Sequence, residues 1–192
     1  MTISLYDITV EAFTPMLRTL STLLDKGAEH AKAKGFDPAV LVNARLAPDM
    51  FPLSRQVQIA CDQAKNAAAR LRGQEPPVFP DDETTIDQLR ARIERTLEYM
   101  ATAKAAEFEG GEDRDIVMPL RGDMVLEVKG LGFARDWTIP HFYFHVVTAY
   151  DILRHNGVEL GKRDYLGHVA SAIRSRPTAR RPGTLATAAW TS

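Results

Sequence analysis

The chain has 192 residues, 45% of them hydrophobic, and its 24 basic and 25 acidic side chains give a formal net charge of -1. This length fits one domain, and the balanced charge argues against nucleic acid or an anionic membrane as a partner. No segment approaches the roughly 20 consecutive apolar residues that a membrane-spanning helix needs. The single cysteine excludes an internal disulfide and the first residues lack an export pattern, so we expect a cytoplasmic location.

The first part of the chain predicts two long helices joined by a short one. Apolar residues at helical spacing indicate a helix from about Leu5 to Lys34, which Gly35 ends. Asp37-Pro38 has the pattern of a helix start and predicts a short connecting helix that ends before Pro48. The second long helix is expected from about Leu53 to Arg72, where many alanines allow neighbouring helices to approach closely.

A third helix is predicted after a proline-rich connector. The segment Glu75–Pro80 must be extended, because proline removes amide donors and pushes the preceding residue out of the helical region. The helix is expected to begin at Thr84 or Thr85, where Thr84 and Asp87 approximate a capping box, and to end before Gly110.

The chain then predicts a β-hairpin and a fourth long helix. Two short apolar runs, Ile116–Leu120 and Met124–Val128, flank a turn that contains Arg121-Gly122-Asp123. The fourth helix is expected from about Thr138 to Asn156-Gly157, and cationic side chains in its last turn favour the exposed carbonyl groups there.

The fourth helix carries the most informative pattern of the sequence. His141 and His145 stand four residues apart, which places both imidazoles on neighbouring positions of one helical face. They lie at the edge of a predicted core stripe, where an imidazole needs a hydrogen-bond partner or a metal. The stripe is expected to consist of Phe142, Val146, Ala149 and Leu153.

A metal site would need more than this histidine pair. Neutral histidines bind zinc, nickel or iron, and a catalytic site usually has about three protein ligands. The second predicted helix offers Gln56, Gln58 and Asp62 as further donors. Asp62 is chemically the best of them, but it falls on the opposite side from the apolar stripe of that helix. The alternative interpretation is a pair of structural histidines with hydrogen-bond partners.

A second polar cluster covers the end of the fourth helix and the loop that follows. Tyr150, Arg154 and Lys162 are candidate small-ligand contacts there, with Asp62 as a further candidate. One interpretation is that the loop 157–167 folds back and brings Lys162 and Arg163 toward an anionic ligand. The alternative is a set of solvated surface charges, whose helical pairs are worth only about 0.2 to 0.5 kcal/mol each.

The last residues differ in composition from the rest of the chain. After Asp164 there is no acidic residue, and arginines accumulate among serine, threonine, proline and alanine. We therefore expect a bundle domain over residues 1–167 and a basic tail over 168–192 that is flexible beyond about Arg174. Binding of RNA or DNA through this tail is the less favoured alternative, since the overall charge is close to zero.

Four long helices, an insertion before the last of them, and a His-x-x-x-His pattern at its start resemble the DinB-like (YfiT-like) superfamily of bacterial four-helix proteins. The segments PHFYFHVVTAYDILRHNGVELGKRDYLG and PDMFPLSRQVQIACDQAK are similar to an uncharacterised branch of it, a domain of unknown function. The resemblance covers about Leu5 to Gly167. We expect an all-α, up-and-down four-helix bundle with a small β-hairpin between helices three and four. Phe144 and Val147 add apolar side chains to the fourth helix, so we expect this helix to be central or part of a dimer interface, and the protein to be a homodimer.

The resemblance also implies a metal site and a type of chemistry. Members of the superfamily typically place three histidines around a divalent metal, and some are thiol-dependent transferases or isomerases. By position, His141 and His145 match the pair on helix four, whereas the histidine of helix two is replaced by a residue such as Gln58. One hypothesis is therefore a non-catalytic or small-ligand-binding homodimer with a degenerate metal site. The other is a divalent-metal-dependent transferase, isomerase or hydrolase that uses the pair.

Overall fold

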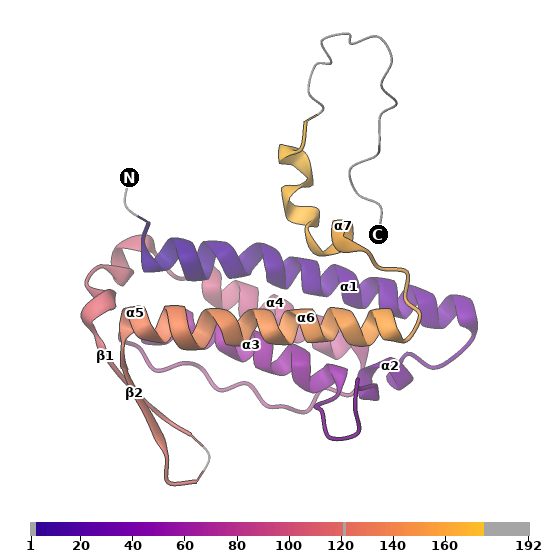
Figure 1. Ribbon diagram of the computed structural model, residues 1–192, viewed down its shortest axis with the longest axis horizontal. Helices are drawn as coiled ribbons and strands as arrows, with labels where there is room; N and C mark the ends of the chain where they lie inside the picture. Colours follow the sequence, from indigo (N-terminus) through magenta and orange to yellow (C-terminus); the bar gives the residue numbers. More distant parts are fainter. Residues whose placement is uncertain (1–2, 121, 175–192) are drawn as a thin grey trace, which may run out of the picture.

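The computed structural model describes residues 3–120 and 122–174, so most of the predicted flexible tail lies outside the described residues. Four long helices lie alongside one another (Figure 1). They are α1 (Ala12–Lys34), α3 (Leu53–Arg70), α4 (Ile86–Ala101) and α6 (Ile139–His155). The predicted all-α bundle is confirmed. In the described part of the chain, no helix is long and apolar enough to cross a membrane.

Shorter elements connect the long helices. They are the π-helical turn η1 (Asp7–Glu11), α2 (Ala39–Asn43), the 3-10 turns η2 (Ala105–Phe108) and η3 (Gly111–Asp113), α5 (Gly130–Gly132), the π-helical segment η4 (Phe133–Thr138), α7 (Lys162–Tyr165) and the 3-10 segment η5 (Gly167–Ala172). Of these, α7 and η5 follow α6 and stand beside α1 at one side of the bundle (Figure 1).

The helices α3 and α4 run in the same direction. Gln58, near the start of α3, bonds Glu83 just before α4, whereas Arg72, just after α3, bonds Tyr99 near the end of α4. The extended connector 74–85 makes this arrangement possible, because it returns along the length of the bundle before α4 begins (Figure 1). These neighbours in the chain are therefore parallel, and not antiparallel as a strict up-and-down order would place them.

The predicted hairpin is confirmed as β1 (Asp115–Pro119) and β2 (Val125–Lys129), which pair antiparallel. Ile116 lies opposite Val128 in this register, and Ile116 is buried against the bundle. Gly122 has a positive φ of 71°, which the tight turn between the strands requires.

The last long helix begins earlier than the sequence suggested. Helical backbone starts at Gly130, and the π-helical segment η4 leads directly into α6. We predicted a start near Thr138, two residues before Pro140. A π turn with its wider hydrogen-bond spacing comes immediately before this proline, which has no amide proton to donate, so the helix continues through it.

The core lies between α1, α3, α4 and α6. The rings of Phe13 on α1 and Phe142 on α6 stack with centroids 4.1 Å apart. The predicted stripe on α6 is confirmed, since all four of its members are fully buried. Phe144 and Val147 remain 58% and 41% exposed on the outer side of the same helix.

Gly130 provides a test of how the hairpin joins the last helix. A Cβ at this position would lie 1.8 Å from the carbonyl oxygen of Gly111, a backbone atom that cannot move aside alone. Gly130→Ala is therefore expected to lower the free energy of unfolding by about 1–3 kcal/mol or more, measured by urea denaturation. Gly132→Ala is the matched control, because its Cβ would meet no atom closer than 3.8 Å. Equal losses in both variants would contradict this packing.

Candidate functional site

The best-defined polar contact between α3 and α6 joins Gln56 to His145. His145 is only 4% exposed, and its Nδ1 lies 2.6 Å from Oε1 of Gln56. The amide nitrogen of Gln56 donates to the carbonyl oxygen of Phe51 at 3.0 Å, so the amide oxygen must face the imidazole. We infer that Nδ1 of His145 carries the proton and donates it to Gln56. In the neutral ring, Nε2 is then the acceptor nitrogen.

Both histidines of the pair favour the neutral form. Burial lowers the pKa of His145 to about 4, and the neighbouring His141 and Arg55 add to this effect. Burial also lowers the pKa of His141. Removing an imidazolium from water is unfavourable, and no carboxylate is among the groups that shift either pKa. At neutral pH the pair therefore presents uncharged imidazoles beside one guanidinium.

One aromatic ring contacts each imidazole of the pair. The imidazole centroids of His141 and His145 are 5.0 Å apart, as their spacing predicted. Trp137 meets His141 edge-on at 5.2 Å, and Phe144 meets His145 edge-on at 5.1 Å.

The structure places Gln58 and Asp62 in a different environment from the histidine pair. The amide of Gln58 donates to Glu83 at 2.9 Å and accepts from Arg55 at 3.1 Å. Asp62 pairs with Arg92 at 2.9 Å. Two residues turn an α-helix by about 200°, so Gln56 and Gln58 point to nearly opposite sides of α3.

The donor set does not match that of a resident catalytic metal. In the described residues, no three His, Cys, Asp or Glu side chains are grouped so that they could hold an ion. Gln56 already accepts a hydrogen bond from His145, which leaves two imidazoles where about three protein ligands are usual. A protein thiol does not complete the set either, because Cys61 is fully buried and burial raises its pKa to about 12.

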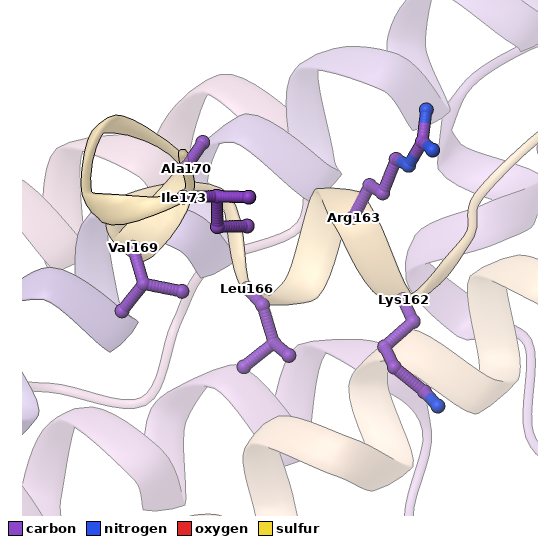
Figure 2. Close-up of a pocket in the computed structure, with 6 residues that line it drawn as sticks. All are labelled: Lys162, Arg163, Leu166, Val169, Ala170 and Ile173. Carbon is purple, nitrogen blue, oxygen red and sulfur yellow. The ribbon is translucent and has the colours of Figure 1, made fainter. Parts of the chain in front are cut away.

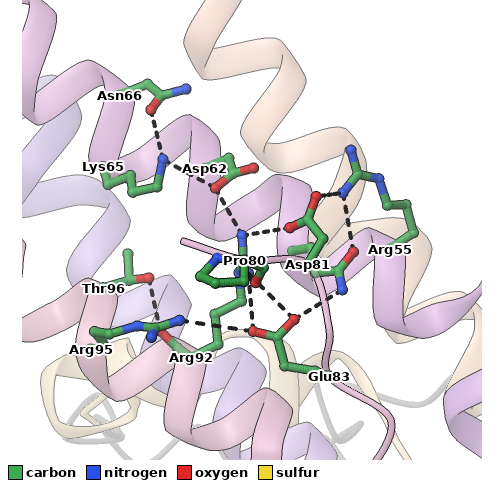
Figure 3. A network of polar contacts seen from close by, with 11 residues as sticks. Arg55, Asp62, Lys65, Asn66, Pro80, Asp81, Glu83, Arg92, Arg95 and Thr96 are labelled. Atoms are coloured by element: carbon green, nitrogen blue, oxygen red, sulfur yellow. Dashed lines mark hydrogen bonds and ion pairs between the residues drawn. The ribbon is translucent and has the colours of Figure 1, made fainter. Parts of the chain in front are cut away.

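Sequence reasoning missed a buried cation of the bundle, Arg92 on α4. Its side chain is completely buried and lies among three carboxylates (Figure 3). Its partners are the carboxylates of Asp62 (2.9 Å), Asp81 (2.9 Å) and Glu83 (3.0 Å) and the carbonyl oxygen of Pro80 (2.7 Å). Arg55 bonds both Asp81 and Gln58, so the network reaches toward the histidine pair. The run of acidic residues 81–83, at the end of the connector, was the one signal in the sequence.

The structure brings together three of the four residues that were predicted as small-ligand contacts. Tyr150, Arg154 and Lys162 line one cavity of about 360 Å³ between α6 and α7, whereas Asp62 belongs to the Arg92 network. The rings of Tyr150 and Tyr165 meet edge-on with centroids 6.2 Å apart. A larger hollow of about 470 Å³ is lined by α7, η5 and the residues next to them (Figure 2). Its lining residues are Lys162, Arg163, Leu166, Val169, Ala170 and Ile173.

The four packed long helices define an all-α bundle protein. The family model described as Domain of unknown function (DUF1993) matches residues 5–166, and the chain therefore belongs to this family. The crystal structure of a DinB family member protein from Shewanella denitrificans is 43% identical to this chain and has a TM-score of 0.78. That match covers 92% of this chain and 96% of the other. No curated protein matches the chain significantly.

Proposed function

We propose that this DUF1993 protein binds a small ligand without catalysis and retains a degenerate metal site in His141 and His145. The observation that carries the proposal is the bond from Nδ1 of His145 to Gln56, which leaves Nε2 as an oriented acceptor. With a pKa of about 4, His145 is a poor base at neutral pH but a good hydrogen-bond acceptor. The complementary ligand group is a hydroxyl, an amine or an amide N–H.

A metal-dependent enzyme of the transferase, isomerase or hydrolase type is the second candidate. The contact that favours it is again the bond between Gln56 and His145. Histidines that bind metals commonly donate their other ring N–H to an oxygen, which fixes the tautomer and the orientation of the ring. His141 and His145 would be the protein ligands of a zinc, nickel or iron ion.

Elemental analysis of protein purified without a histidine tag separates the two candidates. We expect well below one zinc, nickel or iron ion per chain, because the pair supplies fewer ligands than such sites usually have. His145→Ala removes the inner imidazole, and His155→Ala is the control because His155 is exposed at the end of α6. Metal that is close to stoichiometric, retained in His155→Ala and lost in His145→Ala, would overturn the proposal in favour of the enzyme.

A homodimer and a cytoplasmic location remain predictions from the sequence. Phe144 supports the dimer, because its side chain is 58% exposed while its neighbours on the inner face of α6 are buried. Pairing of two copies over this part of α6 would remove the ring from water.

A further inference from the structure

Two contacts of Asp164 position α7, which forms one side of the cavity between α6 and α7. Asp164 on α7 pairs with Lys26 on α1 at 2.5 Å, and its other carboxylate oxygen accepts from the backbone N–H of Gly161 at 2.8 Å. These contacts tie the short helix to the bundle and hold Tyr165 opposite Tyr150. The cavity volume of about 360 Å³ lies within the range of roughly 300–1,000 Å³ that is usual for small-molecule sites.

The lining combines an apolar floor with aromatic rings. Val147 and Leu160 contribute aliphatic side chains, and Tyr150 and Tyr165 contribute two rings in an edge-on arrangement. Burial raises the pKa of Tyr165, so its phenol stays protonated and uncharged at neutral pH. A flat apolar group could contact both rings, since aromatic pairs favour offset and edge-on contacts.

The charges of the lining favour an anion. Arg154 and Lys162 are cationic and Asp151 is anionic, so the three charged side chains sum to one positive charge. No ion pair of Arg154 occurs in the described part of the chain, whereas a planar guanidinium can hold a carboxylate through two parallel hydrogen bonds.

We propose that this cavity is a binding site for a small aromatic carboxylate. The aromatic group lies against Tyr150 and Tyr165, and the carboxylate bonds the guanidinium of Arg154 with Lys162 nearby. The site is separate from the histidine pair and involves neither His141 nor His145. If no aromatic carboxylate binds in this cavity, the proposed function of the histidine pair is therefore unaffected. If the proposed function of the pair is wrong, the proposal for this cavity is equally unaffected.

Calorimetric titration of the full chain with phenylacetate tests the assignment. We expect phenylacetate to bind. The alcohol 2-phenylethanol has the same ring without the charge and should bind at least about tenfold more weakly, which corresponds to about 1.4 kcal/mol of binding free energy. The amine 2-phenylethylamine should not bind, because the net charge of the lining is positive. Equal binding of phenylacetate and 2-phenylethanol, tighter binding of the amine, or no binding of phenylacetate would each overturn the proposal.

Two variants locate the site. Arg154→Gln should weaken phenylacetate binding about tenfold or more and leave 2-phenylethanol unchanged. Arg163→Gln is the matched control, because it also removes one positive charge near the cavity. Arg163 lines the other hollow, and its side chain points away from Lys162 (Figure 2). Both positions are exposed, so neither variant should disturb folding. Equal weakening in both variants would mean that net charge alone attracts the anion, and would overturn the site.

Discussion

Arg92→Met is expected to lower the free energy of unfolding by about 3–5 kcal/mol, the usual cost of removing one partner from a buried ionic network. The guanidinium of Arg92 is completely buried and contacts Asp62, Asp81 and Glu83. Methionine has an unbranched side chain of comparable volume, so the variant removes the charge and the hydrogen bonds but leaves little empty volume. The largest part of this cost should come from Glu83, because its carboxylate would lose its buried cation while its side chain is only 5% exposed to water. Urea denaturation followed by circular dichroism measures the loss.

The control for this prediction stands two residues earlier on the same helix. Arg90 pairs with Asp25 at 2.7 Å, but both side chains are 43% exposed. Solvent screens such a pair, and Arg90→Met should cost less than about 1 kcal/mol. If both variants lost the same stability, burial of the Arg92 network would not be the cause.

Acidification from pH 6.5 to pH 4 is expected to reduce the stability of the protein through His145. Its pKa lies near 6.5 in the unfolded chain and is lowered to about 4 by burial, so the unfolded state binds the proton first. The contribution of this residue is complete above pH 6.5 and is lost as the pH falls toward 4. The full difference corresponds to about 3 kcal/mol.

His145→Gln isolates this contribution from that of the carboxylates. The free energy of unfolding of both proteins is measured by urea denaturation between pH 4 and pH 7.5. The wild-type protein should lose about 3 kcal/mol more than the variant over this interval, because the variant has no imidazole to protonate at this position. Parallel pH profiles would show that His145 is protonated equally well in the folded protein.

The helices and the core stripe of α6 were predictable because each depends on residues close in the sequence. Spacing of apolar residues identifies the buried face of a helix, and all four predicted residues of the stripe are buried. The same local rule placed His141 and His145 together. It could not decide whether Gln56 or Gln58 meets them, since that depends on the rotation of α3 against α6. Gln56 meets His145, and Gln58 faces the network around Arg92.

The Arg92 network could not be predicted for a related reason. Its guanidinium is separated by 30 residues from Asp62, and a helical pattern gives no information about contacts at that distance. The sequence marked the connector as extended but not its path along the bundle. The path of the connector explains the acidic residues at its end. Asp81 and Glu83 provide carboxylates for Arg92, which would otherwise be a buried cation with fewer partners.

The parallel arrangement of α3 and α4 also affects how the chain can fold. Two consecutive parallel helices cannot form a local helical hairpin, so the antiparallel partner of α4 is found in α1, where Asp25 meets Arg90. These two residues are 65 positions apart in the sequence. Contacts between distant segments require large loops to close, and they slow the folding of small domains. This bundle should therefore fold more slowly than a bundle of the same length built from successive hairpins.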